Sequence, residues 1–102
     1  MKEIVTYDEY RDAFKQERSV ILFGKEDCIH CSIVKNCIKS IEKNYPLVNF
    51  YYTIDFDFAN ARSINHYPEL VFYNNGSECG RLAGSEHVNK LKELINIWIL
   101  KL

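Results

Sequence analysis

The feature that most constrains the fold is the Cys-Ile-His-Cys tetrapeptide at residues 28–31. It lies between a short apolar run, residues 20–23, and a segment whose apolar residues recur at helical spacing. This order predicts a buried strand that leads into a helix with both cysteines at its start. Two cysteines three residues apart at a helix start share one face and can form a disulfide without backbone movement. The sequence therefore predicts a redox-active pair at a strand-to-helix junction.

The two thiols are expected to differ in reactivity. Cys28 would face the free N–H groups and the positive end of the helix dipole, and both favour the thiolate. Its pKa is therefore predicted to lie below the value of about 8.5 for a free cysteine. Cys31 lies one turn further along and is predicted to be the more shielded, resolving thiol.

The rest of the chain alternates helical and strand patterns. A capping box at Thr6–Glu9 predicts a helix to about Gln16, and the helix after the cysteines should stop at residues 44–46. Further helical patterns cover residues 59–64 and a final helix that Ser85 caps, with its core-facing residues at Val88, Leu91, Leu94, Ile95 and Trp98. Strands are predicted at residues 20–23, 48–54, 70–73 and, after a turn at 74–76, up to Ala83. This order predicts an α/β fold: one mixed sheet of about four strands flanked by helices.

Composition limits the classes of protein. A length of 102 residues with 47% hydrophobic residues suits a single packed domain, here residues 1–102. The net charge of −1, without long blocks of either sign, provides no electrostatic footprint for nucleic acid or an anionic membrane. The N-terminus has no apolar leader, no apolar run could span a bilayer, and only two of four cysteines have motif spacing. We therefore expect a cytoplasmic, monomeric protein that binds neither nucleic acid nor membrane.

The element order, the cysteine pair, Pro68 before the hairpin, Gly76 in its turn and Gly84 at its end together resemble the thioredoxin family over nearly the whole chain. The resemblance implies a thioredoxin fold in which Pro68 is cis and packs beside the cysteines. It also implies that the main chain of Tyr67 pairs with an extended client segment. The candidate substrate-binding residues are Tyr67, Pro68, Gly84 and Ile29. A trans Pro68 that simply ends a helix is the alternative.

The chain departs from the family pattern at residues that would affect the charge on Cys28 and proton transfer from Cys31. Asp27 stands where thioredoxins have tryptophan, and its charge would raise the pKa of Cys28. His30 would oppose this by stabilising the Cys28 thiolate, unless it only faces solvent. By resemblance, Leu22 and Tyr51 occupy the positions of the buried aspartate and lysine that assist the resolving cysteine. That relay is missing, so slower resolution is expected unless Glu26, His66 or water substitutes.

The leading hypothesis is a thiol–disulfide oxidoreductase with Cys28, Cys31 and His30 as catalytic residues and no metal or organic cofactor. By resemblance, electrons would come from thioredoxin reductase or glutathione, and the partners would be protein disulfides. Two alternatives stay open. One is a zinc module that adds Cys37, Cys79 or His66 to the pair; the other is an interaction protein without redox turnover. Cys37 and Cys79 are otherwise predicted to be structural.

Overall fold

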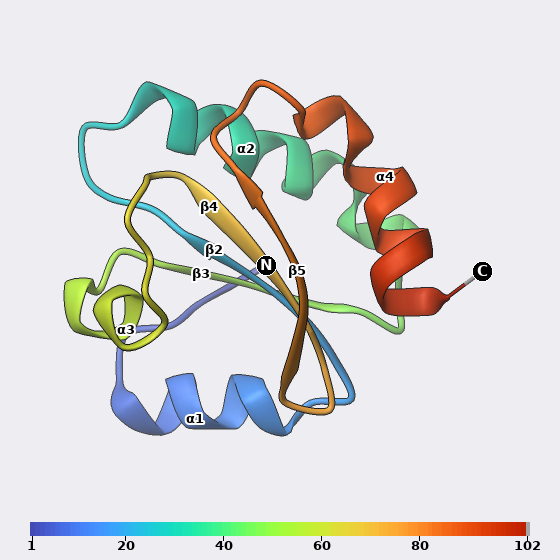
Figure 1. Cartoon of the computed structure of the whole chain (residues 1–102), viewed down its shortest axis with the longest axis horizontal. Coiled ribbons are helices and arrows are strands. Elements are labelled where there is room, and N and C mark those ends of the chain that lie inside the picture. Colours follow the sequence, from blue (N-terminus) through green and yellow to red (C-terminus); the bar gives the residue numbers. More distant parts are fainter. Residues whose placement is uncertain (102) are drawn as a thin grey trace.

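The computed structural model describes residues 1–101, which form a mixed five-stranded sheet between two layers of helices (Figure 1). The strands lie in the order β1-β3-β2-β4-β5. Their bounds are Lys2–Glu3 for β1, Arg18–Phe23 for β2, Asn49–Thr53 for β3, Glu69–Asn74 for β4 and Ser77–Ala83 for β5. Strands β1, β3 and β2 are parallel, whereas β4 and β5 are antiparallel to their neighbours. The predicted α/β architecture is confirmed, with five strands where about four were expected.

Strand β2 lies at the centre of the sheet and leads into the cysteine pair. It pairs with β3 on one side and with β4 on the other, and residues 19–23 are all fully buried. Burial on both faces explains why this strand is a continuous apolar run rather than an alternating one. Its side chains still alternate between two cores, with Val20 and Leu22 on one face and Ile21 and Phe23 on the other.

The helices divide between the two faces of the sheet (Figure 1). Helices α1 (Tyr7–Lys15) and α3 (Phe56–Ala61) cover one face. Helix α2 (Ile29–Ile41) and the C-terminal helical segment cover the other; that segment comprises η2 (Val88–Lys90), α4 (Leu91–Leu94) and the π-helical η3 (Ile95–Leu100). A single 3-10 turn, η1 (Glu42–Asn44), follows α2. Within residues 1–101, no helix is long and apolar enough to cross a bilayer.

Local sequence signals account for several boundaries. The capping box is present, because Glu9 N–H donates to Thr6 Oγ1 and the Glu9 carboxylate accepts from Thr6 N–H. The hairpin between β4 and β5 turns at Asn75 and Gly76, whose φ angles of 49° and 82° suit an Asn-Gly turn. Both predictions are confirmed.

Three expectations differ from the structure. Strand β1 is not predicted, since two exposed residues are too short for a periodic pattern; it is held by pairing with β3. Helix α3 begins earlier than residue 59, because Asp55 caps it by accepting the N–H groups of Asp57 and Phe58. Ser85 does not cap the last helix, since its hydroxyl is hydrogen-bonded to His30 and the helical segment begins only at Val88.

Candidate active site

Cys28 and Cys31 form a disulfide at the start of α2, with their Cα atoms 5.2 Å apart. Cys28 is the N-cap residue, and its sulfur accepts the backbone N–H of Cys31 at 3.1 Å. The same sulfur therefore forms the disulfide and occupies the position where a helix offers free N–H donors. This arrangement favours negative charge on Cys28 once the disulfide is reduced.

The two sulfur-bearing residues differ in exposure. Cys28 is half-buried, whereas Cys31 is only 3% exposed. The chain reaches this arrangement through the turn after β2, where Gly24 N–H donates to Thr53 O and Asp27 adopts a left-handed φ of 53°. Asp27 is exposed beside Cys28. The predicted shielding of Cys31 relative to Cys28 is confirmed.

His30 connects α2 to the segment after β5. Its Nδ1 lies 2.7 Å from Ser85 Oγ, a hydrogen bond between residues 55 positions apart in sequence. In the described part of the chain no hydrogen bond joins His30 to Cys28. The influence of His30 on the Cys28 thiolate stays a prediction. Sequence reasoning missed Ser85 as its partner because a serine before a helix is normally interpreted as a cap.

A groove of about 160 Å³ lies beside His30. Its walls are His30, Tyr67, Pro68, Gly84, Ser85 and Glu86. The Tyr67–Pro68 peptide bond is cis, as the family resemblance implies. Gly84, with a φ of 71°, donates its N–H to Pro68 O at 2.8 Å. Tyr67 lines this groove, and within residues 1–101 no backbone–backbone hydrogen bond uses its main chain.

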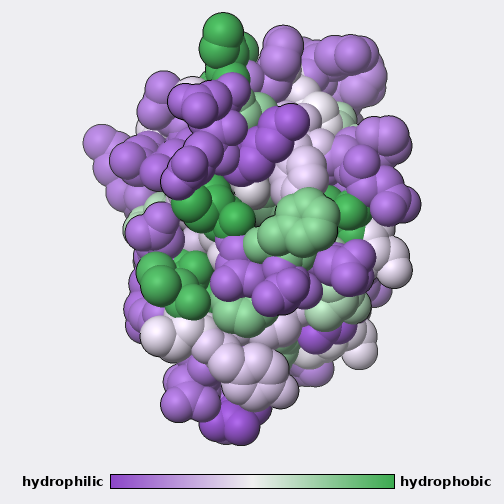
Figure 2. All heavy atoms as spheres, turned by 90° about the vertical axis from the view of Figure 1, so that its left-hand side faces the viewer, coloured by the Kyte–Doolittle hydropathy of each residue, from purple (hydrophilic) through white to green (hydrophobic). Residues whose placement is uncertain are grey.

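The surface around the cysteines mixes apolar and charged groups. Figure 2 shows the face that carries the β2–α2 turn and α3, where hydrophobic side chains lie in separate groups among hydrophilic ones. Ile29, between the two cysteines, is 77% exposed. An apolar side chain so exposed beside a reactive sulfur is available for contact with a client.

The predicted site residues thus lie in one region of the molecule. A family model for thioredoxin matches residues 2–97. The chain belongs to the thioredoxin family. Redox chemistry at a Cys-x-x-Cys pair is the general activity of this family, and the disulfide between Cys28 and Cys31 fits it.

Solved thioredoxins share the fold of this family member. Thioredoxin from Plasmodium falciparum is 24% identical, with a TM-score of 0.85 over 96% of this chain and 99% of that chain. Thioredoxin from Fasciola hepatica is 23% identical, with a TM-score of 0.84 over 96% and 99%. Mitochondrial thioredoxin 3 from Saccharomyces cerevisiae, in its oxidised form, is 22% identical, with a TM-score of 0.84 over 95% and 94%. A search of curated protein sequences found no significant match.

This thioredoxin-family chain has a second hollow on the other side of its cysteines. It has a volume of about 580 Å³ and is lined by Lys25, Glu26, Asp27, Cys28, Ile29, Cys31, Ser32, Lys35 and Tyr52. Leu22 is fully buried beneath it and provides no carboxylate. Tyr51 packs in the core on the opposite face of the sheet, whereas Tyr52 pairs in register with Leu22. The sequence analysis matched Tyr51 to the relay lysine of the family and did not single out Tyr52, which lies on the same face of the sheet as Leu22.

The remaining cysteines lie away from the pair and in packed surroundings. Cys37 is half-buried on α2 near the carbonyl of Val88, and Cys79 Sγ lies 3.3 Å from Phe72 O. Burial raises the pKa of both thiols. Within residues 1–101, no group of three or more His, Cys, Asp or Glu side chains is arranged to hold a metal ion.

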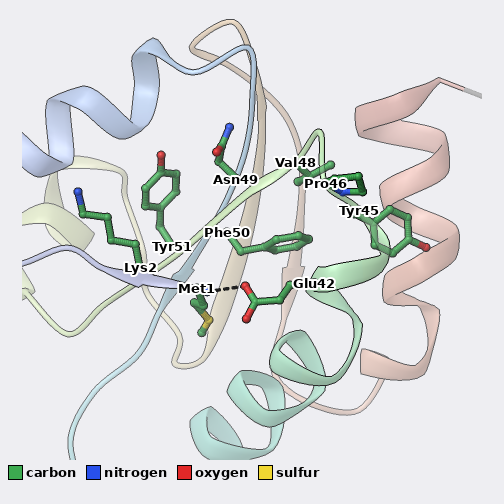
Figure 3. Close-up of a pocket in the computed structure, with 9 residues that line it drawn as sticks. All are labelled: Met1, Lys2, Glu42, Tyr45, Pro46, Val48, Asn49, Phe50 and Tyr51. Atoms are coloured by element: carbon green, nitrogen blue, oxygen red, sulfur yellow. Dashed lines mark hydrogen bonds and ion pairs between the residues drawn. The ribbon is translucent and has the colours of Figure 1, made fainter.

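A further hollow, of about 300 Å³, lies between the N-terminus and the end of α2 (Figure 3). Glu42 forms an ion pair there with the Met1 amino group, at 2.5 Å, and Phe50 and Tyr51 line its wall. Its lining contains no cysteine and no histidine. We therefore assign it no part in the thiol chemistry.

Proposed function

We propose that this protein exchanges disulfides with other proteins through Cys28 and Cys31. The observation that carries the proposal is the placement of the half-buried Cys28 at the N-cap of α2, bonded to a buried Cys31. An accessible, stabilised thiolate next to a shielded partner is what nucleophilic attack and subsequent release require.

The reaction proceeds in two steps. The Cys28 thiolate attacks one sulfur of a client disulfide, so that a mixed disulfide forms and the other client sulfur leaves as a thiolate. The Cys31 thiolate then attacks Cys28 Sγ, the Cys28–Cys31 bond forms, and the second client sulfur leaves. The client gains two electrons and the two protons that the cysteine thiols lose.

The groove beside His30 is the proposed binding site for an extended client segment. The main chain of Tyr67 provides free polar groups, Pro68 and Gly84 form the adjacent wall, and Ile29 adds exposed apolar surface. Recognition through main-chain hydrogen bonds selects an extended disulfide-bearing segment and depends little on the amino-acid sequence of that segment.

The proposed source of electrons is thioredoxin reductase or glutathione. In support, one structural neighbour comes from work on the thiol-resolving mechanism in yeast mitochondrial 1-Cys peroxiredoxin via glutathione/thioredoxin systems. We further propose that the protein acts as a monomer in a reducing compartment, the cytoplasm, where Cys37 and Cys79 would stay free thiols.

Trapping tests the proposed function. A Cys31→Ser variant lacks the resolving thiol, so clients should accumulate on Cys28 as mixed disulfides that survive denaturing, non-reducing electrophoresis. The Cys28→Ser variant is the matched control, since it keeps Cys31, Cys37 and Cys79. Adducts that mass spectrometry places on Cys28 would support the proposal. An equal yield of adducts from both variants would contradict it.

A further inference from the structure

Gly24 separates the resolving sulfur from an aromatic ring. A methyl group placed on Gly24 would lie 2.9 Å from Tyr52 Cε2, 3.4 Å from Tyr52 Oη and 3.4 Å from Cys31 Sγ. The Tyr52 oxygen and the Cys31 sulfur therefore both lie 3.4 Å from the same empty position. The distance between these two atoms is at most about twice that value. This range includes separations that one bridging water can span. Any larger residue at position 24 would fill the space.

The fold holds the Tyr52 ring in this position. Tyr52 pairs with Leu22 in the β2–β3 register and packs against the core beneath α2. The Lys35 ammonium of α2 lies 4.1 Å from the centre of the Tyr52 ring, a cation–π contact. Two elements thus fix the ring beside Cys31, and all three residues line the same open hollow.

Cys31 must carry a negative charge in both directions of the disulfide exchange. It must become a thiolate to resolve a mixed disulfide, and it must leave as a thiolate when the disulfide is reduced. Its burial disfavours that charge. Leu22, the residue beneath, has no polar group that could compensate.

We propose that the Tyr52 hydroxyl donates a hydrogen bond to the Cys31 sulfur, directly or through one water, whenever that sulfur carries negative charge. This inference rests on the proposed function and names the group that assists its second step. The Cys31 proton passes to water in the open hollow, and the thiolate attacks Cys28 Sγ. The Cys28–Cys31 bond forms, and the client sulfur leaves with the electron pair of the bond that breaks.

The charges around the hollow are consistent with a donor role. Burial first, and then the carboxylates of Glu3 and Glu26, raise the pKa of Tyr52, so its hydroxyl keeps its proton at neutral pH. Lys25, Asp27 and Lys35 are the other charged residues of the lining, and Cys28 is its other thiol. A neutral phenol beside a buried thiolate can act only as a donor to it.

The first experiment measures how fast dithiothreitol reduces the Cys28–Cys31 disulfide. Dithiothreitol attacks Cys28, the more accessible of the two cysteines, and Cys31 leaves as a thiolate, so a weaker donor slows the reaction. Tyr52→Phe removes only the hydroxyl and keeps the ring under Lys35. We expect it to reduce the rate at pH 7 several-fold. Tyr51→Phe is the matched control, because it removes the same atom from the neighbouring residue on the opposite face of the sheet, and it should leave the rate unchanged.

The second experiment follows Cys31 itself. In a Cys28→Ser background, alkylation of Cys31 is measured against pH, with mass spectrometry separating it from Cys37 and Cys79. Adding Tyr52→Phe should move the midpoint upward by about one pH unit, as loss of a hydrogen bond to a charged group would. Adding Tyr51→Phe should not move it.

Unchanged rates and midpoints in Tyr52→Phe would overturn the inference, as would equal effects of the two tyrosine variants. Neither measurement involves a protein client. Failure of client trapping would therefore contradict the proposed function without affecting these two readouts, and failure of the readouts would leave client trapping intact.

Discussion

Two thiols of the same helix lie in opposite environments. Cys28 caps α2, is half-exposed and accepts a backbone N–H. Cys37 lies two turns or more further along, packed near Val88, where burial raises its pKa. The helix dipole favours a thiolate only within its first turn. Position in one helix therefore decides which thiol reacts.

Reduced protein exposed to iodoacetamide at pH 7 should be modified at Cys28 at least about ten times faster than at Cys37, because alkylation follows the thiolate fraction. Peptide-resolved mass spectrometry measures both rates in the same sample, so Cys37 is the internal control. The Cys28 rate should reach half its maximum below about pH 8.5. Equal rates, or a Cys28 midpoint at or above that pH, would contradict the proposed nucleophile.

The hydrogen bond between His30 and Ser85 orients an imidazole next to the disulfide. If His30 stabilises the Cys28 thiolate, then His30→Ala should make the disulfide harder to reduce, by several-fold in its equilibrium constant with glutathione. Ser85→Ala should shift the constant in the same direction but less, since the ring remains and only its orientation is released. An unchanged constant in His30→Ala would show that the ring only faces solvent.

At the scale of elements, the β4–β5 hairpin supports the loop that carries Tyr67 and Pro68. Arg81 of β5 donates to the carbonyls of Arg62 and Ser63, where that loop begins. It also pairs with Glu69, which directly follows Pro68 and is only 7% exposed, at 3.5 Å. The hydrogen bond to Glu78 is the main reason that the pKa of Arg81 is raised. One guanidinium thus connects both ends of the substrate-groove loop.

Arg81→Met should lower the free energy of unfolding by about 2 kcal/mol, because it leaves a buried carboxylate and two carbonyls without their donor. Urea denaturation followed by circular dichroism measures this. Arg11→Met removes an exposed arginine paired with Asp8 and should change stability by less than about 0.5 kcal/mol. A similarly small effect of Arg81→Met would mean that water replaces the guanidinium.

At the scale of the whole molecule, the C-terminal helical segment packs on the sheet, with Trp98 lying against β5. A Cβ on Gly80 would lie 2.4 Å from Trp98 Cε3, so the indole rests directly on the backbone of β5. Trp98 also stacks edge-on against Phe72, and its carbonyl accepts from Asn74 Nδ2 at 2.8 Å. This contact fixes how the segment covers the core that α2 also covers. We propose that the chain therefore unfolds as one domain.

Gly80→Ala should destabilise the protein by about 1–3 kcal/mol, because the indole must move out of a packed position. Ser77→Ala, at an exposed site of the same strand, should stay within about 0.5 kcal/mol of the parent. Trp98 is the only tryptophan, so its fluorescence reports the docking directly while circular dichroism reports the sheet and helices. Coincident urea transitions by the two signals are expected for one domain. Separate transitions would contradict it.

Patterns that act over short distances were predictable from the sequence. The capping box of α1, the apolar run of β2, the Asn75-Gly76 turn and the shielding of Cys31 relative to Cys28 all depend on residues a few positions apart. Such features follow from backbone geometry and periodicity, which the local sequence specifies. The same local signals failed at Ser85, where the cap was wrong.

Contacts between distant segments were decided only by the tertiary structure. Ser85 bonds to His30 instead of a helix end, Tyr52 rather than Tyr51 faces Cys31, and β1 exists only because β3 lies beside it. Each depends on strand register or on a loop meeting another loop, and a shift of one residue in a strand moves a side chain to the opposite face. The chain by itself therefore determined where the thiol pair lies and that it begins a helix. The surrounding donors were determined by packing, because hydrogen bonds across tens of residues form only when the sheet has brought their partners together.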